Sequence, residues 1–193
     1  MVRKREFNTD EALDAAMHVF WVKGFEATSL TDLTTAMGIQ RPSLYGAFGD
    51  KKELFERVLR RYTNVHAAEI RARLGHGESV IEAIREVFEQ IAAEGRAGDP
   101  AYGCFCINTM VELAPHEPKF AVLTREHQMY LAVIFREVVE RGVRSGELEG
   151  HLNAGLAAHS LVMSMIGLTV LMKSGPDRQF VEQSIQAALS VLQ

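Results

Sequence analysis

Cysteine and proline are scarce in this sequence, with two cysteines and five prolines in 193 residues. Two cysteines cannot build a disulfide framework, and the first residues, MVRKREFN, lack the apolar run of a secretion signal. The longest apolar stretch, residues 156–172, is shorter than the roughly 20 residues of a membrane-spanning helix and contains four Ser, Thr and His side chains. We therefore predict a cytoplasmic protein with no membrane span, in which this stretch forms a buried helix.

Catalytic and metal-binding signatures are also missing. The sequence has no Ser/His/Asp-type arrangement, no nucleophile elbow and no glycine-rich phosphate loop, so a cysteine or histidine enzyme is poorly supported. His66, His116, His127 and His159 are scattered without an H-x-x-x-H spacing, which favours buried or capped side chains over metal ligands. We predict that the chain is not an enzyme and binds no metal or cofactor.

An excess of positive charge, which is typical of nucleic-acid-binding proteins, is absent, since the formal net charge is −4. The charge is unevenly divided, however. Residues 1–62 contain ten Lys and Arg against nine Asp and Glu, a net charge of +1, whereas the remainder contains eleven against sixteen, a net charge of −5. Because local potential steers a binding partner, the N-terminal part is the candidate to contact DNA, although a merely solvated surface would give the same +1.

Residues 28–51, TSLTDLTTAMGIQRPSLYGAFGDK, predict two short helices joined by a tight turn. Ser29 and Asp32 have the spacing of a capping box at the start of the first helix. Gly38 ends that helix, because glycine adopts the left-handed conformation of a sharp reversal without steric cost. Pro42 falls in the first turn of the second helix, where proline is tolerated. The stretch is therefore predicted to be a helix-turn-helix.

The second helix of this motif presents a polar surface that suits DNA. Helical spacing turns Leu44 and Phe48 inward and leaves the other side chains outside. In a helix-turn-helix the N-terminal end of the second helix enters the major groove, where Gln and Arg bond base edges and hydroxyl groups reach phosphates. A basic arm at residues 3–5 is either a groove contact or a mobile tail. The predicted outward-facing residues are Gln40, Arg41, Ser43, Tyr45 and Ala47, and Pro42 is counted with the predicted DNA-binding residues.

These residues resemble a known family. The succession of "AMHVFWVKGFEATSL", "MGI", "SLYGAF", "GDK" and "ELF" is similar to the DNA-binding region of the TetR family of bacterial transcriptional repressors over residues 9–62, and the rest is similar in helical architecture and length. The resemblance implies a homodimeric, ligand-responsive repressor in which Thr28, Tyr45 and Lys51 grip phosphates of a double-stranded DNA operator. Gly46 and Ala47 depart from the family, where larger His or Tyr side chains are common at these positions.

The remaining sequence predicts further helices and an all-α fold. Capping boxes at residues 8–11 and 50–53 open a first helix that ends at Gly24 and a long fourth helix that reaches Leu74. Apolar spacings of three and four predict helices at about 79–94, between about 101 and 115, from 118, at 156–172 and after 177. The sequence thus predicts a three-helix, helix-turn-helix DNA-binding domain at 1–62, followed by a larger helical ligand-binding and dimerisation domain at 63–193.

Two surfaces are predicted beyond the DNA-binding domain. Apolar and aromatic residues near the far end of the fourth helix are candidates to bind a hydrophobic or amphipathic small-molecule effector, although they would also make an ordinary core. The last two helices are candidates for a four-helix dimer interface, or for an intrachain hairpin that covers the core. The pocket candidates are Tyr62, His66, Phe88, Phe105, Met110, His127 and Tyr130, and the interface candidates are Leu161, Met165, Leu168, Phe180, Val181, Ile185 and Ala188.

Cys104 and Cys106 support an alternative function. Two residues apart on a helix, they would be rotated by about 200° and could neither pair nor chelate one metal. One of them could act as a single reactive thiol that detects electrophiles or oxidants, as in a few relatives of the resembled family, but a small buried hydrophobe is the simpler interpretation. An interaction-only helical bundle is a third class, which would not need the exposed polar side chains of the second motif helix together.

Overall fold

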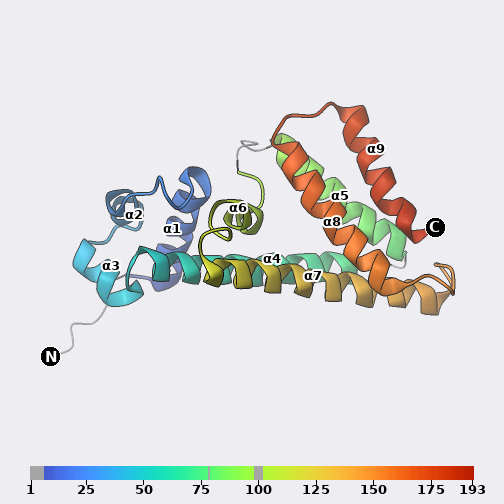
Figure 1. Cartoon of the computed structure of the whole chain (residues 1–193), viewed down its shortest axis with the longest axis horizontal. Helices are drawn as coiled ribbons and strands as arrows, with labels where there is room; N and C mark the ends of the chain where they lie inside the picture. The colour runs from blue at the N-terminus through green and yellow to red at the C-terminus, as the bar shows by residue number, and fades with distance from the viewer. Residues whose placement is uncertain (1–6, 78, 98–101) are drawn as a thin grey trace. The chain divides into compact units, whose positions relative to one another are not determined.

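A computed structural model of the chain describes residues 7–77, 79–97 and 102–193, and the basic arm at residues 3–5 lies outside them. All regular structure in the described residues is helical, which confirms the predicted all-α fold (Figure 1). The elements are α1 (Thr9–Lys23), α2 (Leu30–Ala36), α3 (Arg41–Phe48), α4 (Lys51–Gly75), α5 (Val80–Ala97), α6 (Phe105–Glu112), α7 (Pro118–Ser145), α8 (Ala154–Met172), α9 (Arg178–Leu189) and a closing 3₁₀ turn, η1 (Ser190–Leu192).

The helices form two compact units that are not contiguous in sequence. The N-terminal unit combines Met1–Asn64 with Phe105–Thr124, and the C-terminal unit combines Val65–Cys104 with Arg125–Gln193. The first division lies close to the boundary predicted at residue 62. The N-terminal unit also contains α6 and the start of α7, and α4 and α7 each contribute residues to both units.

Local signals account for the helices of the N-terminal unit. The side chain of Asn8 accepts a hydrogen bond from the backbone N–H of Asp10 at 3.0 Å and caps α1. Ser29 and Asp32 form the predicted capping box of α2. Gly38 has φ of +63°, the left-handed conformation that turns the chain from α2 towards α3. The predicted helix-turn-helix is confirmed.

The core of the N-terminal unit is built from leucine and aromatic side chains. Leu33 of α2 and Leu44 and Phe48 of α3 are fully buried. Phe20 of α1 meets Phe55 of α4 edge to face, with the ring centroids 4.8 Å apart. Residues from all four helices therefore contribute to one core, which fixes α3 against its neighbours.

In the C-terminal unit, α5, α8 and α9 pack against one another, and Figure 1 shows them side by side. Their inward side chains share a core with those of α4 and α7, in which Phe88 and Phe135 are fully buried. Residues 66 and 71 of α4 pair with residues 127 and 137 of α7, so the two helices run parallel within this unit.

α8 behaves as a core helix. By length and composition alone it could cross a membrane, a test that buried helices of other proteins also pass. Seven of its residues are buried within the C-terminal unit. Asn153 caps its start by accepting the backbone N–H of Leu156 at 3.0 Å. This placement agrees with the buried helix predicted from the sequence.

Most of the predicted interface residues of α8 and α9 lie in the core of their own chain. In this chain they pack as the alternative prediction describes, in a hairpin that covers the core. Phe180 is the exception, with an exposed fraction of 47%. Leu161, Met165, Leu168, Val181, Ile185 and Ala188 are at most 6% exposed and belong to the core cluster.

Two glycines of the helix-turn-helix provide a matched test of this local structure. An added Cβ meets no atom within 4 Å at either Gly46 or Gly38. Gly46 is helical, so Gly46→Ala should raise the free energy of unfolding by about 0.5–1 kcal/mol. Gly38→Ala forces alanine to a positive φ and should lower the free energy of unfolding by about 1–2 kcal/mol. Urea denaturation measures both changes, and effects of the same sign would contradict the left-handed turn.

Candidate DNA-reading surface and effector region

The N-terminal end of α3 presents the predicted DNA-facing residues on the surface. Gln40 is the N-cap residue, and its side chain makes no capping hydrogen bond. Gln40, Arg41, Pro42, Ser43 and Tyr45 are all exposed, with Tyr45 at 50%. An amide, a guanidinium group and two hydroxyl groups are therefore displayed along one short helix. We call these five residues the reading surface.

The side of α3 opposite the reading surface packs against the rest of the N-terminal unit. Leu44 and Phe48 are fully buried, as predicted, but Ala47 is also buried at 7%, although its position was predicted to face outward. The guanidinium of Arg57, on α4, donates to the carbonyl oxygen of Ala47 at 3.1 Å and lies 5.8 Å from the centre of the Phe48 ring. α4 thus fixes the C-terminal end of α3, which explains the burial of Ala47.

Arg41 is oriented by a contact that the sequence did not predict. Its guanidinium donates to the hydroxyl of Thr31 at 3.0 Å. Thr31 is exposed on α2, so the pair bridges the two helices of the motif on their solvent side. The polar surface therefore extends from α3 onto α2.

The start of α2 carries a negative charge that is balanced locally. Lys23 donates to Asp32 at 2.6 Å, and the hydroxyl and backbone N–H of Ser29 donate to the same carboxylate. The Lys23 ammonium, followed by Ser29, holds the pKa of Asp32 well below its usual range. The carboxylate is thus ionised at neutral pH, and its pairing with Lys23 limits its repulsion of a polyanion.

The residues implied to grip phosphates differ in their exposure. Thr28 is 2% exposed, and its hydroxyl donates to the carbonyl oxygen of Gly24 at 2.5 Å. Lys51, the first residue of α4, is partly exposed, and its Nζ lies 4.4 Å from the centre of the Phe25 ring. Tyr45 and Lys51 are available at the surface, whereas Thr28 supports the loop before α2.

Three of the predicted effector residues belong to the N-terminal unit, where aromatic rings gather around α6. The ring of Phe105 lies 5.6 Å from that of Tyr62 and 5.2 Å from that of Phe55. Trp21 meets Tyr62 edge to face at 5.1 Å. Met110 is partly buried on the same helix as Phe105. The structure therefore brings Tyr62 and Phe105 into one aromatic cluster.

The other four predicted effector residues belong to the C-terminal unit. His66 Nδ1 and His127 Nε2 are 3.1 Å apart, so one imidazole donates to the other. Phe88 is fully buried in the core. Tyr130 is 47% exposed, and the Arg71 guanidinium lies 5.7 Å from the centre of its ring. The structure thus brings the two histidines together, while Phe88 contributes to packing and Tyr130 to the surface.

Burial disfavours a charge on either imidazole of the histidine pair. Desolvation lowers the pKa of His66 against the opposing effect of Glu94, and desolvation together with His66 lowers the pKa of His127 to about 4. Both rings are therefore neutral at pH 7. Among the described residues, no group of three or more His, Cys, Asp or Glu side chains is placed to hold a metal ion.

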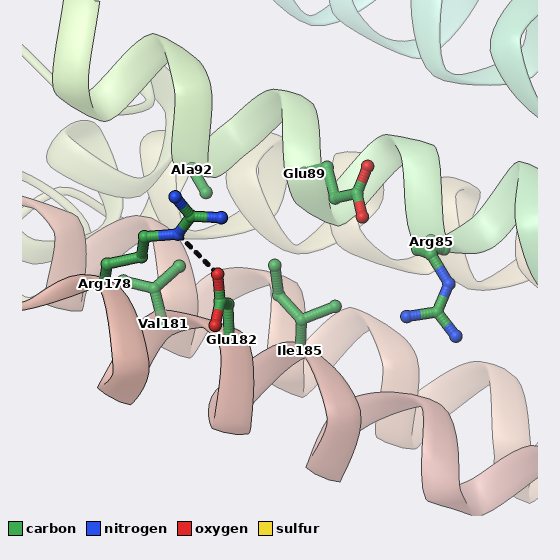
Figure 2. Close-up of a pocket in the computed structure, with 7 residues that line it drawn as sticks. All are labelled: Arg85, Glu89, Ala92, Arg178, Val181, Glu182 and Ile185. Carbon is green, nitrogen blue, oxygen red and sulfur yellow. Dashed lines mark hydrogen bonds and ion pairs between the residues drawn. The ribbon is translucent and has the colours of Figure 1, made fainter.

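A separate pocket lies between α5 and α9 in the C-terminal unit (Figure 2). Its volume is about 390 Å³, and its walls combine two arginines and two glutamates with three apolar side chains. Arg178 and Glu182 pair with each other at 2.6 Å across one turn of α9. The lining residues are Arg85, Glu89, Ala92, Arg178, Val181, Glu182 and Ile185, none of which was predicted to bind an effector.

The two cysteines occupy different environments. Cys104 is partly exposed and precedes the first residue of α6, so the helical geometry assumed for the pair does not apply to it. Cys106 is 1% exposed within α6. Both are thiols rather than partners in a disulfide. Burial matches the simple packing interpretation for Cys106, whereas Cys104 retains access to solvent.

Two family models match the chain. The model described as "Bacterial regulatory proteins, tetR family" covers residues 12–58, which include the helix-turn-helix. The model described as "Tetracyclin repressor-like, C-terminal domain" covers residues 80–188. The two matches therefore account for both the candidate DNA-reading region and most of the helices that follow it.

Sequence relatives and solved structures match the chain along most of its length. The chain is 34% identical to the uncharacterized HTH-type transcriptional regulator YezE of Bacillus subtilis over the full length of both proteins. It is 35% identical to the HTH-type transcriptional repressor ComR of Escherichia coli, over 90% of this chain and 83% of ComR. A cysteine mutant of the TetR family regulator CifR, solved with operator DNA, superposes with a TM-score of 0.85 at 31% identity, covering 97% and 98% of the two chains.

The histidine pair makes stability depend on pH. The pKa of His127 is lowered to about 4, so below pH 6.5 the unfolded state binds more protons than the folded state. The free energy of unfolding should fall as the pH drops from 6.5 towards 4, by up to about 3 kcal/mol. Urea denaturation at several pH values should show a shallower fall for His127→Gln than for the wild type. His151→Gln, at a surface position, controls for the loss of a histidine, and an equal change of slope in both variants would contradict the assignment.

Proposed function

The chain belongs to the TetR family of bacterial regulatory proteins, and from this premise we propose that it is a repressor that binds a pseudo-palindromic DNA operator as a homodimer and is released by a small-molecule effector. The observation that supports this most directly is the reading surface of α3, where Gln40, Arg41, Ser43 and Tyr45 are exposed together on a buried support. The complex of CifR with operator DNA gives the same fold a DNA partner. Such a role places the protein in the cytoplasm and needs no catalytic step.

Within the operator complex, we assign base reading and backbone contact to different residues. Gln40 and Arg41 begin α3, so they are nearest the base edges when that helix enters the major groove, and each can form a bidentate pair. Ser43, Tyr45 and Lys51 are placed to contact phosphates beside them, and Pro42 shapes the helix start. Thr28 is not proposed to contact a phosphate, because its hydroxyl already donates to the carbonyl oxygen of Gly24.

The division of labour follows the two predicted domains. We propose that residues 1–62 bind the operator and that residues 63–193 form the dimer and, with Tyr62 at the domain boundary, bind the effector. α4 links these functions, since it begins at Lys51, soon after the end of α3, and contributes residues to both compact units. A ligand that prefers one position of this helix would change how the reading surfaces are presented.

The dimer interface is proposed on the outer faces of the last two helices. Leu156, Met163 and Val170 recur every seven residues on α8 and are 69%, 72% and 46% exposed. Phe180 and Ala187 repeat that spacing on α9, and both are exposed. A spacing of seven keeps residues on one face over two turns, so each helix carries an uncovered apolar stripe that a second subunit can bury.

For the effector, we propose a small hydrophobic or amphipathic molecule. Within the N-terminal unit, the cluster of Trp21, Tyr62 and Phe105 offers aromatic surface to such a molecule. Within the C-terminal unit, the neutral pair of His66 and His127 separately offers hydrogen-bonding groups without charge. Met110 provides an adaptable side chain on the same helix as Phe105. The α5–α9 pocket is less suited to such a ligand, because its walls carry four charged side chains.

A thiol-sensing repressor is the second candidate. Cys104 supports it, because this residue is partly exposed and lies directly before α6. The relative CifR was solved as a cysteine mutant. Modification of Cys104 would act at the start of the helix whose first residue, Phe105, packs in the aromatic cluster.

The proposed DNA contacts predict two different losses of DNA-binding affinity. With an operator selected from random DNA, Arg41→Ala should cost about 1–3 kcal/mol in binding free energy and relax base preference at one position, because a base-edge contact is lost. Lys51→Ala should weaken operator and random DNA alike, because a phosphate contact carries no base information. Mobility-shift titrations measure both, with Arg136→Ala on α7 as the arginine control. Equal loss on operator and random DNA for Arg41→Ala would refute the division.

The proposed dimer interface predicts that a charged substitution on the exposed face of α8 will make the protein monomeric. Met163→Glu places charges on the apolar stripe of α8, and burying them unpaired in the dimer should cost about 3 kcal/mol or more. We expect light scattering to report monomers and operator affinity to fall sharply. Met129→Glu on α7, where Met129 is 60% exposed, is the matched control and should stay dimeric. A dimeric Met163→Glu variant would place the interface elsewhere.

A further inference from the structure

The carboxylate of Glu112 joins two segments of the N-terminal unit that are far apart in sequence. Glu112 is the last residue of α6. Its Oε2 accepts the backbone N–H of Phe25 and its Oε1 accepts the backbone N–H of Glu26, each at 3.0 Å. Both oxygens of one carboxylate therefore accept from consecutive amides of the loop between α1 and α2.

The loop is shaped to receive this carboxylate. Gly24 has φ of +80°, and a Cβ added there would lie 3.0 Å from both carboxylate oxygens of Glu112. A larger residue would therefore be strained in its backbone and crowded by the carboxylate. The absence of a side chain at residue 24 lets Glu112 approach the two amides directly.

The same loop is immobilised on its other sides. The hydroxyl of Thr28 donates to the carbonyl oxygen of Gly24 at 2.5 Å. The ring of Phe25 packs edge to face on Phe55, with centroids 5.2 Å apart. The loop then leads directly into Ser29, which caps α2. Its position therefore sets where α2 begins.

α2 in turn is tied to the reading surface. Only the turn at Gly38 separates it from α3, and Arg41 donates to Thr31 of α2 at 3.0 Å. A shift of the α1–α2 loop would therefore be passed to the N-terminal end of α3. The hydrogen bonds of Glu112 go to the backbone of Phe25 and Glu26, so its influence on DNA would act through this loop.

We propose that Glu112 is a positioning residue for DNA recognition, which holds the α1–α2 loop and hence α2 and α3 in the arrangement that binds the operator. This inference rests on the proposed function. It makes α6 a structural part of the unit that carries the reading surface, although α6 lies within the residues matched by the C-terminal family model.

The test is Glu112→Gln in the full chain. The glutamine amide keeps one acceptor and sets an NH₂ donor against a backbone N–H, so one hydrogen bond is lost and the loop is loosened. We expect operator affinity to fall about tenfold, because it is reduced by the fraction of protein molecules in which α2 and α3 keep the arrangement that binds the operator. Hydrogen exchange of the Phe25 and Glu26 amides should accelerate. The removal of a negative charge alone predicts the opposite change, tighter DNA binding.

Glu147→Gln is the matched control. Glu147 accepts the backbone N–H groups of Val80 at 2.7 Å and Ile81 at 2.9 Å, so the same substitution removes the same charge and the same kind of contact in the C-terminal unit. This variant should lose stability without losing operator affinity. Glu112→Asp, which keeps the charge but shortens the side chain, should weaken operator binding as Glu112→Gln does.

The outcomes separate the inference from the proposed function. Wild-type protein that prefers no selected DNA over random DNA would refute the proposed function. Wild-type binding that Glu112→Gln retains in full, or unchanged exchange at Phe25 and Glu26, would overturn the role of Glu112. An equal loss of affinity in Glu147→Gln would also overturn it, because the effect would then be one of general stability.

Discussion

The recognition helix α3 contains eight residues, too few to be stable by itself in water, where isolated helices need roughly 12–15. It forms because Leu44 and Phe48 are completely buried in the N-terminal unit. That burial also sets its orientation, since a rotation by one residue, about 100°, would expose both side chains and turn Arg41 away from its present direction. The reading surface is thus a consequence of the packing beneath it.

Polar contacts at the ends of the short helices complete this arrangement. Ser29 and Asp32 form hydrogen bonds with backbone N–H groups at the start of α2. Arg57 donates to a carbonyl group at the end of α3, and Glu112 accepts from two amides of the loop before α2. Backbone groups in these positions lack partners within their own helix. Because each partner comes from a defined place in the unit, the same contacts that satisfy the backbone also locate α2 and α3.

The features that sequence predicts well in this protein depend on residues within four positions of one another. The cap at Ser29 and the turn at Gly38 are of this kind, whereas Glu112 is 86 residues from one of its two partners and has no local signature. α8 shows a second limit, because a helix that is apolar nearly all round has no periodic pattern to separate a core face from an interface face. Leu161 and Met163 are both apolar, but they are 0% and 72% exposed, and only packing within the C-terminal unit distinguishes them.

α6 connects two features of the N-terminal unit, the aromatic cluster at its first residue and the loop before α2 at its last. A ligand changes operator affinity only through its different affinities for two conformations. At one end of α6, Phe105 packs against Trp21 and Tyr62, and at the other end Glu112 holds the loop before α2. A ligand that displaced α6 would withdraw the acceptor of two amides, each bond to a charged group contributing about 1.5–3 kcal/mol. Such a loss would be as large as the coupling of about 1–3 kcal/mol that typical allosteric proteins use.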